Sequence, residues 1–489
     1  MEIVQLSLLL LVFVALAVAM FLRKIPALLA LPIMAFLIPI ISGVSVADTL
    51  QLVLGQGTLR LAEAYTIAIF GSMLSILLQK TGIAEGFIKI GAELSGDKPF
   101  IITLIMLILI ILLFTTLGGL GAIIMVSTIV LPILASVGVG PVTIVGVFLF
   151  GISIGGILNV GNWALYTTVL SLPIDTVRPF AMVMFLLTFV TAILYITIQL
   201  YRDGHDIRFG KIVLYSLIFL VIIGMLYFAY SGLSPYKKWQ FGLLIKGVGL
   251  YLKYAIGAGI LLLFALSVLR LFAKRDEGKR NWISFFTPVV PLFLILLFDM
   301  NFIAAFICGL IYGFLSTYRK GSLNIFTRSI LEGGGVVMPA VALMLGIGML
   351  LNAVMGPSNL SSTAYSAGWP VLLLLKPVLA EIVPSNGFVY ILLFTACAPL
   401  ALYRGPLNVW GMGYGIAAIF LASGMNPGAI MGLLMAVGQI QGISDPTNTQ
   451  NVWLANEVQI DVQKILWNTI VYTWGIALVG LVISSLFFY

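Results

Sequence analysis

The sequence predicts an all-α polytopic membrane protein made of two inverted repeats, with about 12 spanning helices, two re-entrant hairpins and helices broken at mid-membrane. Three observations predict this fold class. Hydrophobic residues make up 61% of the 489 residues and charged residues only 9%, whereas soluble domains carry about 25% charged residues. Apolar runs long enough to cross a bilayer recur along the chain, and its two halves resemble each other in sequence.

Apolar runs of about 20 residues indicate spanning helices, because the hydrocarbon core of a bilayer is about 30 Å thick. The expected spans are 3–22, 25–42, 61–79, 141–173, 178–201, 210–231, 244–270, 283–299, 301–318, 334–356, 427–459 and 464–488. The first run lacks a basic segment before it and is followed by Arg23 and Lys24. We therefore expect a membrane anchor rather than a cleaved signal peptide.

Two further apolar regions, 99–137 and 387–424, are interpreted as re-entrant hairpins, each with two short arms around a tip. The first tip is rich in glycine and contains Gly118, Gly119 and Gly121. The second tip is polar and contains Arg404, Gly405 and Asn408. Non-helical backbone is tolerated at membrane depth only where protein or a wet cavity surrounds it, so both tips are expected inside the protein.

Most of the 25 Lys and Arg residues fall in alternate loops, which the positive-inside rule assigns to the cytoplasm. This pattern predicts a multi-pass protein of the inner (cytoplasmic) membrane with both termini outside. It also accounts for the formal net charge of +8 without a nucleic-acid partner.

The scarcity of reactive side chains excludes several chemistries. The only histidine, His205, cannot build a histidine metal cluster, and Cys308 and Cys397 lie in apolar runs that imply neither a disulfide framework nor a metal knuckle. The sequence contains no Walker loop, no GxSxG nucleophile elbow and no HExxH zinc motif. We therefore expect neither enzymatic activity nor a cofactor.

An internal repeat at an offset of 286 residues is the most informative feature. The residues that match at this offset are Gly138 with Gly424, Pro141 with Pro427, Gly146 with Gly432, Gly156 with Gly442, Asn162 with Asn448 and Asp175 with Asp461. Residues 111–115 match 391–395 at an offset of 280, which predicts an insertion of six residues in the second half. The expected topology inverts the two halves, a plan typical of secondary transporters.

Two of the predicted spans, 141–173 and 427–459, are too long for one straight helix, because 33 residues extend about 50 Å. Glycine and asparagine at 155–162 and the polar run 442–451 are expected to break them. The freed N–H groups of a broken helix suit a carboxylate, and its freed carbonyls suit Na⁺.

The expected binding pocket combines the two tips with the two breaks. The candidates for substrate binding are Gly118, Gly119, Gly121, Asn159, Asn162, Arg404, Gly405, Asn408, Ser444, Thr447, Asn448 and Thr449. The candidates for cation coupling are Asp445, Asn162 and Asn448, with Na⁺ expected at Asp445, Asn448 and Thr449. Arg404 suits a bidentate grip on a carboxylate, and Asp445 suits Na⁺ or a coupled proton. The alternatives are that these two charges pair with each other or that Arg404 snorkels to the outer rim.

Other polar features receive structural interpretations. Amphipathic segments at 82–94 and within 357–384 are either interfacial arms or ordinary loop helices. Glu63 and Glu332 are expected at the N-terminal starts of their spans, where a helix favours carboxylates. Asp175 and Asp461 are expected to cap the helices that follow them.

These tips and breaks resemble the ion-transporter superfamily of elevator-type carriers, which includes divalent-anion/Na⁺ symporters and citrate, gluconate and lactate permeases. Residues 118–122 together with 138–141 are similar to the glycine-rich first hairpin of lactate-permease-like members. Residues 444–449 are similar to the Ser-Asn-Thr signature of the divalent-anion symporters, which touches substrate and Na⁺. Asp445 and Pro446 interrupt that signature, and Asn162 lacks flanking Ser and Thr.

The resemblance implies a homodimer in which a transport domain slides against a scaffold. The corresponding segments are 1–98 (scaffold and first arm), 99–201 (first transport repeat), 202–282 (two connecting helices), 283–386 (scaffold and second arm) and 387–489 (second transport repeat).

From the resemblance and the expected site, we predict a Na⁺- or H⁺-coupled secondary transporter of a small organic anion, a carboxylate, with an elevator mechanism. The alternative is a Na⁺/H⁺ antiporter that uses Asp445 without an organic substrate. A membrane enzyme would need paired reactive side chains within the spans, and a channel would need rings of like charge or a repeated filter. Neither pattern is present in the sequence.

Overall fold

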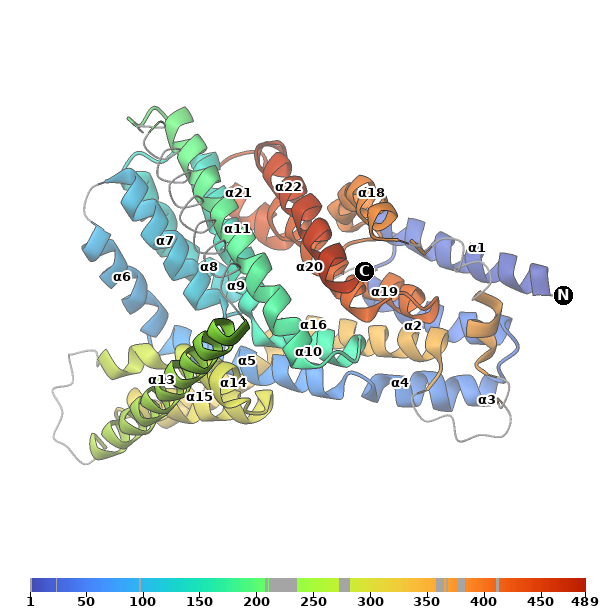
Figure 1. The fold of residues 1–489 in the computed structure, drawn as a ribbon, viewed down its shortest axis with the longest axis horizontal. Coiled ribbons are helices and arrows are strands. Elements are labelled where there is room, and N and C mark those ends of the chain that lie inside the picture. Colours follow the sequence, from blue (N-terminus) through green and yellow to red (C-terminus); the bar gives the residue numbers. More distant parts are fainter. Residues whose placement is uncertain are drawn as a thin grey trace.

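In the computed structural model, the described residues are 2–22, 24–95, 98–206, 210, 235–271, 282–357, 365, 368–375, 383–384, 386–409 and 413–489. Within these ranges every regular element is a helix (Figure 1). Eight helices of the described chain are long and apolar enough to cross a membrane, and shorter apolar helices accompany them. The predicted all-α polytopic fold is therefore confirmed, whereas the predicted span 210–231 lies outside the described residues apart from Gly210.

The chain begins with α1 (Glu2–Phe21), α2 (Ala27–Ile41), α3 (Val46–Asp48), η1 (Thr49–Gly55), α4 (Gln56–Leu59) and α5 (Ala62–Lys80). The last four elements form one continuous helical segment, Val46–Lys80. The predicted span 61–79 therefore begins too late, because Gln51, Gln56 and Gly57 lower the hydropathy of its first turns. A π-helical segment, η1, widens the helix there.

Helix α6 (Ile83–Ser95) confirms the first amphipathic segment. Its apolar face buries Ile83 and Ile88, and its polar face carries an ion pair between Lys89 and Glu85 at 2.7 Å. The second amphipathic segment, 357–384, lies largely outside the described residues.

The first repeat consists of a helical hairpin, a broken helix and a long helix. Its elements are α7 (Pro99–Phe114), α8 (Gly119–Ser136), α9 (Pro141–Leu158), α10 (Val160–Val169) and α11 (Ile174–Arg202). The hairpin turns at 115–118, and the predicted break falls at Asn159, whose ψ of 118° is extended. Asp175 lies in the first turn of α11, whose N-cap is Pro173. The expectation that Asp175 caps this helix is therefore wrong.

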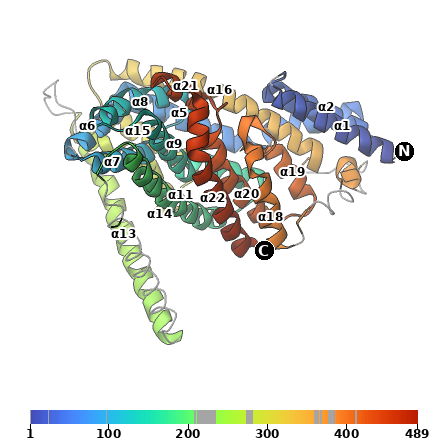
Figure 2. The same cartoon turned by 90° about the horizontal axis from the view of Figure 1, so that it is seen from above.

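The middle of the chain contains α13 (Pro235–Leu269), η2 (Trp282–Phe286), α14 (Val289–Phe298), α15 (Phe302–Ser316) and α16 (Ser322–Met355). Helix α13 projects from one side of the molecule (Figure 2), and its Lys253 lies 5.3 Å from the Phe298 ring. Helix α16 begins 12 residues before the predicted span 334–356. Glu332 is therefore internal to the helix rather than at its start, and it pairs with Lys80 at 2.9 Å.

The second repeat reproduces the plan of the first. Its elements are α18 (Gly387–Cys397), η4 (Ala398–Arg404), α19 (Tyr414–Ala422), α20 (Pro427–Gln439), η6 (Ile440–Ser444), α21 (Thr449–Glu457) and α22 (Val462–Phe488). The break spans 445–448, within the predicted run 442–451. Asp461 caps α22 as predicted, because its Oδ1 accepts the Gln463 N–H at 2.9 Å.

The element bounds follow the predicted offset of 286 residues. Helix α9 corresponds residue for residue to α20 and η6 together, and both α11 and α22 end at matching positions. Gly138 and Gly424 precede these helices with φ of +83° and +86°, a conformation that glycine adopts without steric cost. The repeat is therefore a repeat of backbone structure as well as of sequence.

Two groups of helices pack against each other. Helices α5 and α16 lie side by side, and α16 also contacts α2. In Figure 1 α5 and α16 run across the other long helices. The two repeats contact each other through α11 with α20 and α22, and through α9 with η6. The first group contacts the repeats through α8, α10 and α19, so the half-helix α10 and the hairpin helices α8 and α19 face α5 or α16.

Candidate functional site

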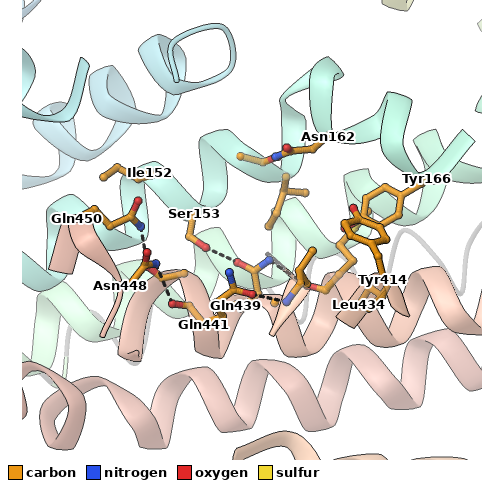
Figure 3. Close-up of a pocket in the computed structure, with 16 residues that line it drawn as sticks. Ile152, Ser153, Asn162, Tyr166, Tyr414, Leu434, Gln439, Gln441, Asn448 and Gln450 are labelled. Carbon is orange, nitrogen blue, oxygen red and sulfur yellow. Dashed lines mark hydrogen bonds between the residues drawn. The ribbon is translucent and has the colours of Figure 1, made fainter. Parts of the chain in front are cut away.

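A cavity of about 210 Å³ lies between the two broken helices (Figure 3). The first repeat contributes Ile152, Ser153, Gly156, Ile157, Asn162 and Tyr166 to its lining. The second repeat contributes Val409, Tyr414, Leu434, Met435, Gly438, Gln439, Gln441, Gly442, Asn448 and Gln450. The described residues of the lining supply amides, hydroxyls and apolar groups, and none of them is acidic or basic.

The two repeats meet in the cavity through residues at equivalent positions. Ser153 Oγ donates to Gln439 Oε1 at 2.7 Å, and these residues are separated by the repeat offset of 286. Gln439 is buried and also donates to the Met435 carbonyl at 3.0 Å. The cavity therefore lies where the two halves face each other.

At the first break, side chains of α10 cap the freed carbonyls of α9. Asn162 Nδ2 donates to the Gly156 carbonyl at 2.8 Å, and Trp163 Nε1 donates to the Ile157 carbonyl at 2.7 Å. A helix C-terminus leaves such carbonyls without intrahelical partners. Asn162 is a predicted site residue, and the structure places it in the cavity lining.

At the second break, three amides cap the carbonyls of η6. Asn448 Nδ2 donates to Gln441 O (3.3 Å), Gln450 Nε2 to Gly442 O (3.0 Å) and Asn451 Nδ2 to Ile443 O (2.9 Å). Asn448 and Gln450 line the cavity. Any cation bound to these carbonyls would use their second lone pairs, because the first already accepts an N–H group.

The residues that end the first half of each broken helix, 159 and 445, occupy the same repeat position. Asn159 Oδ1 accepts the Gly161 N–H at 2.9 Å, and Asp445 Oδ1 accepts the Thr447 N–H at 2.9 Å. The two breaks therefore share one backbone turn, in which a side-chain oxygen accepts the N–H group two residues later. The first turn is neutral and the second carries a carboxylate.

Asp445 is 1% exposed and is the only acidic side chain that is fully buried among the described residues. Besides the Thr447 N–H, its Oδ1 accepts the Tyr403 N–H at 3.0 Å and the Thr447 hydroxyl at 2.8 Å. Its Oδ2 accepts from Asn408 Nδ2 at 3.3 Å. All of these contacts are donors, which is what the acceptor oxygens of a carboxylate require. Asp445 thus connects the second tip to the second break, as the predicted convergence requires.

The other predicted residues of the second tip lie close to this carboxylate. Asn408 is buried, and the next N–H group, that of Val409, donates to Gln441 Oε1 at 2.7 Å. Gly405 approaches the Leu400 carbonyl so closely that a Cβ atom would overlap it. The side chain of Arg404 lies outside the described part of the structure.

The predicted residues of the first tip are not part of the cavity lining. Gly118, Gly119 and Gly121 are exposed at the tip. Gly119 has φ of +81°, and a Cβ atom there would lie 3.1 Å from Val336 on α16. This tip therefore contacts α16. It does not line the cavity in this conformation.

The remaining predicted residues lie around the second break. Ser444 Oγ faces α22, where it lies 2.8 Å from both Thr469 Oγ1 and Thr473 Oγ1. Thr449 is the first residue of α21. Neither side chain lines the cavity.

Sequence reasoning missed several polar residues that line the cavity: Ser153, Tyr166, Tyr414, Gln439, Gln441 and Gln450. Tyr166 and Tyr414 lie together at one end, opposite the amides (Figure 3). The repeat carried a usable signal, because applying its offset to Ser153 leads to Gln439. Within the described residues, no group of three or more His, Cys, Asp or Glu side chains could hold a metal ion.

Comparison with known proteins identifies the fold. No family model matches the chain, and no curated protein matches its sequence. Among solved structures, the chain is similar to the YdaH transporter of Alcanivorax borkumensis, with a TM-score of 0.53 and 14% sequence identity. The match covers 90% of this chain and 88% of that chain. The protein is therefore a multi-pass helical membrane protein with the fold of the YdaH transporter.

Proposed function

We propose that this protein is a cation-coupled secondary active transporter of a small organic anion, a carboxylate, with elevator-type alternating access. The observation that carries the proposal is the cavity enclosed by two broken helices at equivalent repeat positions. Broken helices at the interface of inverted repeats are where secondary transporters bind substrate and coupling ions. A volume of about 210 Å³ is below the range of about 300–1,000 Å³ for drug-sized ligands, which favours a small substrate.

The N-terminus of α21 supports an anionic substrate. Asn448 is its N-cap residue and makes no side-chain cap hydrogen bond, while its Nδ2 donates to the Gln441 carbonyl. The first N–H groups of a helix and its dipole attract anions. Asn448 and Gln450 place this helix end at the cavity, and we propose that Arg404 in the nearby tip adds a positive charge. Asn162 would bind the substrate from the first repeat.

Asp445 supports coupling to Na⁺ or H⁺. A buried carboxylate at membrane depth is costly and indicates function, and we propose that Asp445, Asn448 and Thr449 form the cation site. Binding of the cation would offset the charge of the substrate, so that the loaded domain crosses an apolar scaffold at lower cost. The moving part would be 99–201 with 387–489, in a homodimer in the inner membrane. The contacts of α8, α10 and α19 with α5 and α16 are compatible with this division.

A thermal-shift screen of carboxylates, with and without Na⁺, tests binding to the cavity. A ligand that binds only the folded state raises the melting temperature, so we expect stabilisation by at least one carboxylate that increases with Na⁺ or changes with pH. Gly156→Leu, which fills the cavity from the first repeat, should abolish the shift. Gly475→Leu is the matched control, because Gly475 is exposed and a Cβ atom there would have no other atom within 4 Å. Absence of any shift across the panel would contradict carboxylate binding.

A Na⁺/H⁺ antiporter is the second candidate, favoured by Asp445 being the one fully buried acid of the described chain. It predicts pH-driven Na⁺ flux in proteoliposomes that lack any organic substrate. It also predicts that Arg404→Ala has little effect on this flux. Flux that requires an added carboxylate would exclude the antiporter.

A further inference from the structure

We propose that Asp445 is a positioning residue that holds the tip of the second hairpin, 398–409, on the second broken helix through the hydrogen bonds that its carboxylate accepts. The inference rests on the proposed function only for the interpretation of this tip as a gate of the cavity. The contacts of Asp445 and the backbone of Tyr403 carry the argument.

The hydrogen bonds of Asp445 join two separate segments. Tyr403 N–H and Asn408 Nδ2 come from the tip, at 3.0 and 3.3 Å from the carboxylate oxygens. The Thr447 N–H and hydroxyl come from the break, at 2.9 and 2.8 Å. An ionised carboxylate only accepts hydrogen bonds, and bonds to an ionised group are stronger than neutral ones. The carboxylate is therefore suited to hold these donors together.

The backbone of the tip requires such a partner. Tyr403 has φ of 55° and ψ of 33°, which is the left-handed region that residues with a Cβ atom avoid. Conformations of this kind persist where the surroundings determine them. Tyr403 is 37% exposed, so burial of its ring contributes little. Its hydroxyl donates to Gln463 Oε1 at 3.2 Å, and its N–H bond to Asp445 is the contact that holds the backbone of the turn.

The tip that Asp445 holds is part of the cavity wall. The Val409 N–H donates to Gln441 Oε1 at 2.7 Å, and both residues line the cavity. Asn408 also donates to the Ala401 carbonyl at 3.2 Å, so it ties the two sides of the tip together. Releasing Tyr403 and Asn408 would therefore loosen the wall at Val409.

The equivalent residue of the first repeat makes the opposite kind of contact. Asn159 Nδ2 donates to the Phe114 carbonyl at 3.3 Å, just before the first tip. That tip turns at Gly119, which adopts positive φ without cost. The first tip is thus held by a neutral donor and needs no carboxylate.

Hydrogen–deuterium exchange of the full-length protein in detergent tests the proposal without any substrate. In Asp445→Asn, an amide N–H₂ group faces the Asn408 donor, and we expect amides in 403–409 to exchange at least about 10-fold faster. Amides in 115–121 should keep their wild-type rates. In Asn159→Asp, a carboxylate faces the Phe114 carbonyl, so we expect faster exchange at 115–121 and none of the change at 403–409.

Asp461→Asn is the matched control. Asp461 makes the same type of turn, accepting the Gln463 N–H at 2.9 Å, and makes no hydrogen bond to Tyr403 or Asn408 itself. The Gln463 side chain accepts the Tyr403 hydroxyl at 3.2 Å, a bond that Asp461→Asn leaves in place. In Asp461→Asn, amides in 403–409 should exchange at the wild-type rate. Wild-type exchange at 403–409 in Asp445→Asn, with α20 and α22 still protected, would overturn the proposal.

If Asp445→Asn unfolds the second repeat as a whole, Asn408→Ala decides, because it removes the bond to Oδ2 and leaves the carboxylate in place. A local increase at 403–409 would then support the proposal, and wild-type exchange would overturn it. Because these measurements need no transport, their failure is distinguishable from failure of the proposed function.

Discussion

The two broken helices have the same backbone plan but different charge. In each, the residue that follows the first half has a side chain that accepts the N–H group two residues later, Asn159 in the first repeat and Asp445 in the second. Each uses amide or indole N–H groups to cap the carbonyls freed by the break. The difference teaches that the duplicated architecture builds the cavity, while one substitution at an equivalent position places the buried charge on one side only.

The two hairpin tips differ in a corresponding way. The first tip is the short turn 115–118 between α7 and α8, whereas the second extends over 398–409 after α18. The six residues that the change of offset predicts as an insertion fall between 395 and 424, the interval that contains this longer tip. Tyr403 and Asn408, the partners of Asp445, belong to it. The second repeat therefore carries both the charge and the segment that binds it.

The shared architecture is most sensitive at the glycines of the repeat. A Cβ atom at Gly146 would overlap the Tyr195 hydroxyl, and one at the equivalent Gly432 would overlap Ser484 Oγ. Overpacking of this kind costs about 1–3 kcal/mol. We expect Gly146→Val to destabilise more than Gly432→Val, because buried Tyr195 also donates to Asn468 at 2.8 Å. Thermal unfolding in detergent measures both, and an unchanged melting temperature would contradict the close packing.

The equivalence of the two repeats at the cavity is testable with a residue swap. We expect Ser153→Ala and Gln439→Ala each to lower substrate uptake about 10-fold, because a part-buried hydrogen bond of about 1.4 kcal/mol lies between them. The double variant Ser153→Gln/Gln439→Ser exchanges the partners across the repeat axis and should restore uptake to near wild type. A swap that is as defective as the single variants would show that the two halves are not interchangeable here.

The tips predict a smaller asymmetry in stability. Gly119→Ala should destabilise the first tip by about 1 kcal/mol, because φ of +81° disfavours a Cβ atom. Tyr403→Gly relieves the same strain in the second tip but loses a contact of the Tyr403 hydroxyl with Gln463 at 3.2 Å. We therefore expect no net change from it. Denaturation midpoints of both variants check this contrast, and equal destabilisation would contradict it.

The smallest effect is expected at a pair of equivalent basic residues. Arg178 pairs with Asp299 at 2.7 Å and so joins α11 to the end of α14. Lys464, at the matching position, forms no ion pair with the residues that the structure describes. An exposed ion pair contributes about 0–1 kcal/mol, so Arg178→Ala should destabilise slightly and Lys464→Ala not at all. Identical unfolding curves for the two variants would contradict a stabilising contribution from the ion pair of Arg178.

Much of the fold could be predicted from the sequence, because lipid selects for long apolar runs and the repeat fixes equivalent boundaries. The breaks at Asn159 and 445–448 followed from polar residues within runs that are too long for one helix. The starts of α3 and α16 could not be predicted, because the first turns of these helical segments contain polar side chains that lower the hydropathy. Neighbouring helices supply hydrogen-bond or ionic partners for such side chains, which the sequence does not show. Glu332, for example, pairs with Lys80 from another helix.

The candidate site could be predicted only in part. Asn162 and Asn448 were recognisable as a matched pair, and both line the cavity. Ser153 and Gln439 are single polar residues in apolar helices, and only tertiary packing brings them together. Substrate binding by the Gly118 tip was predicted on the assumption that both tips reach one pocket. The structure brings only the second tip to the cavity.

The central claim is that the protein binds a small organic anion in the cavity between the two broken helices and transports it across the membrane with a cation. Gradient-driven uptake into proteoliposomes tests this claim most directly. Wild-type protein should accumulate at least one radiolabelled carboxylate when a Na⁺ or H⁺ gradient is imposed, and Gly156→Leu should abolish this uptake while Gly475→Leu preserves it. Absence of gradient-dependent uptake for every carboxylate in the panel, or full uptake by Gly156→Leu, would contradict the account.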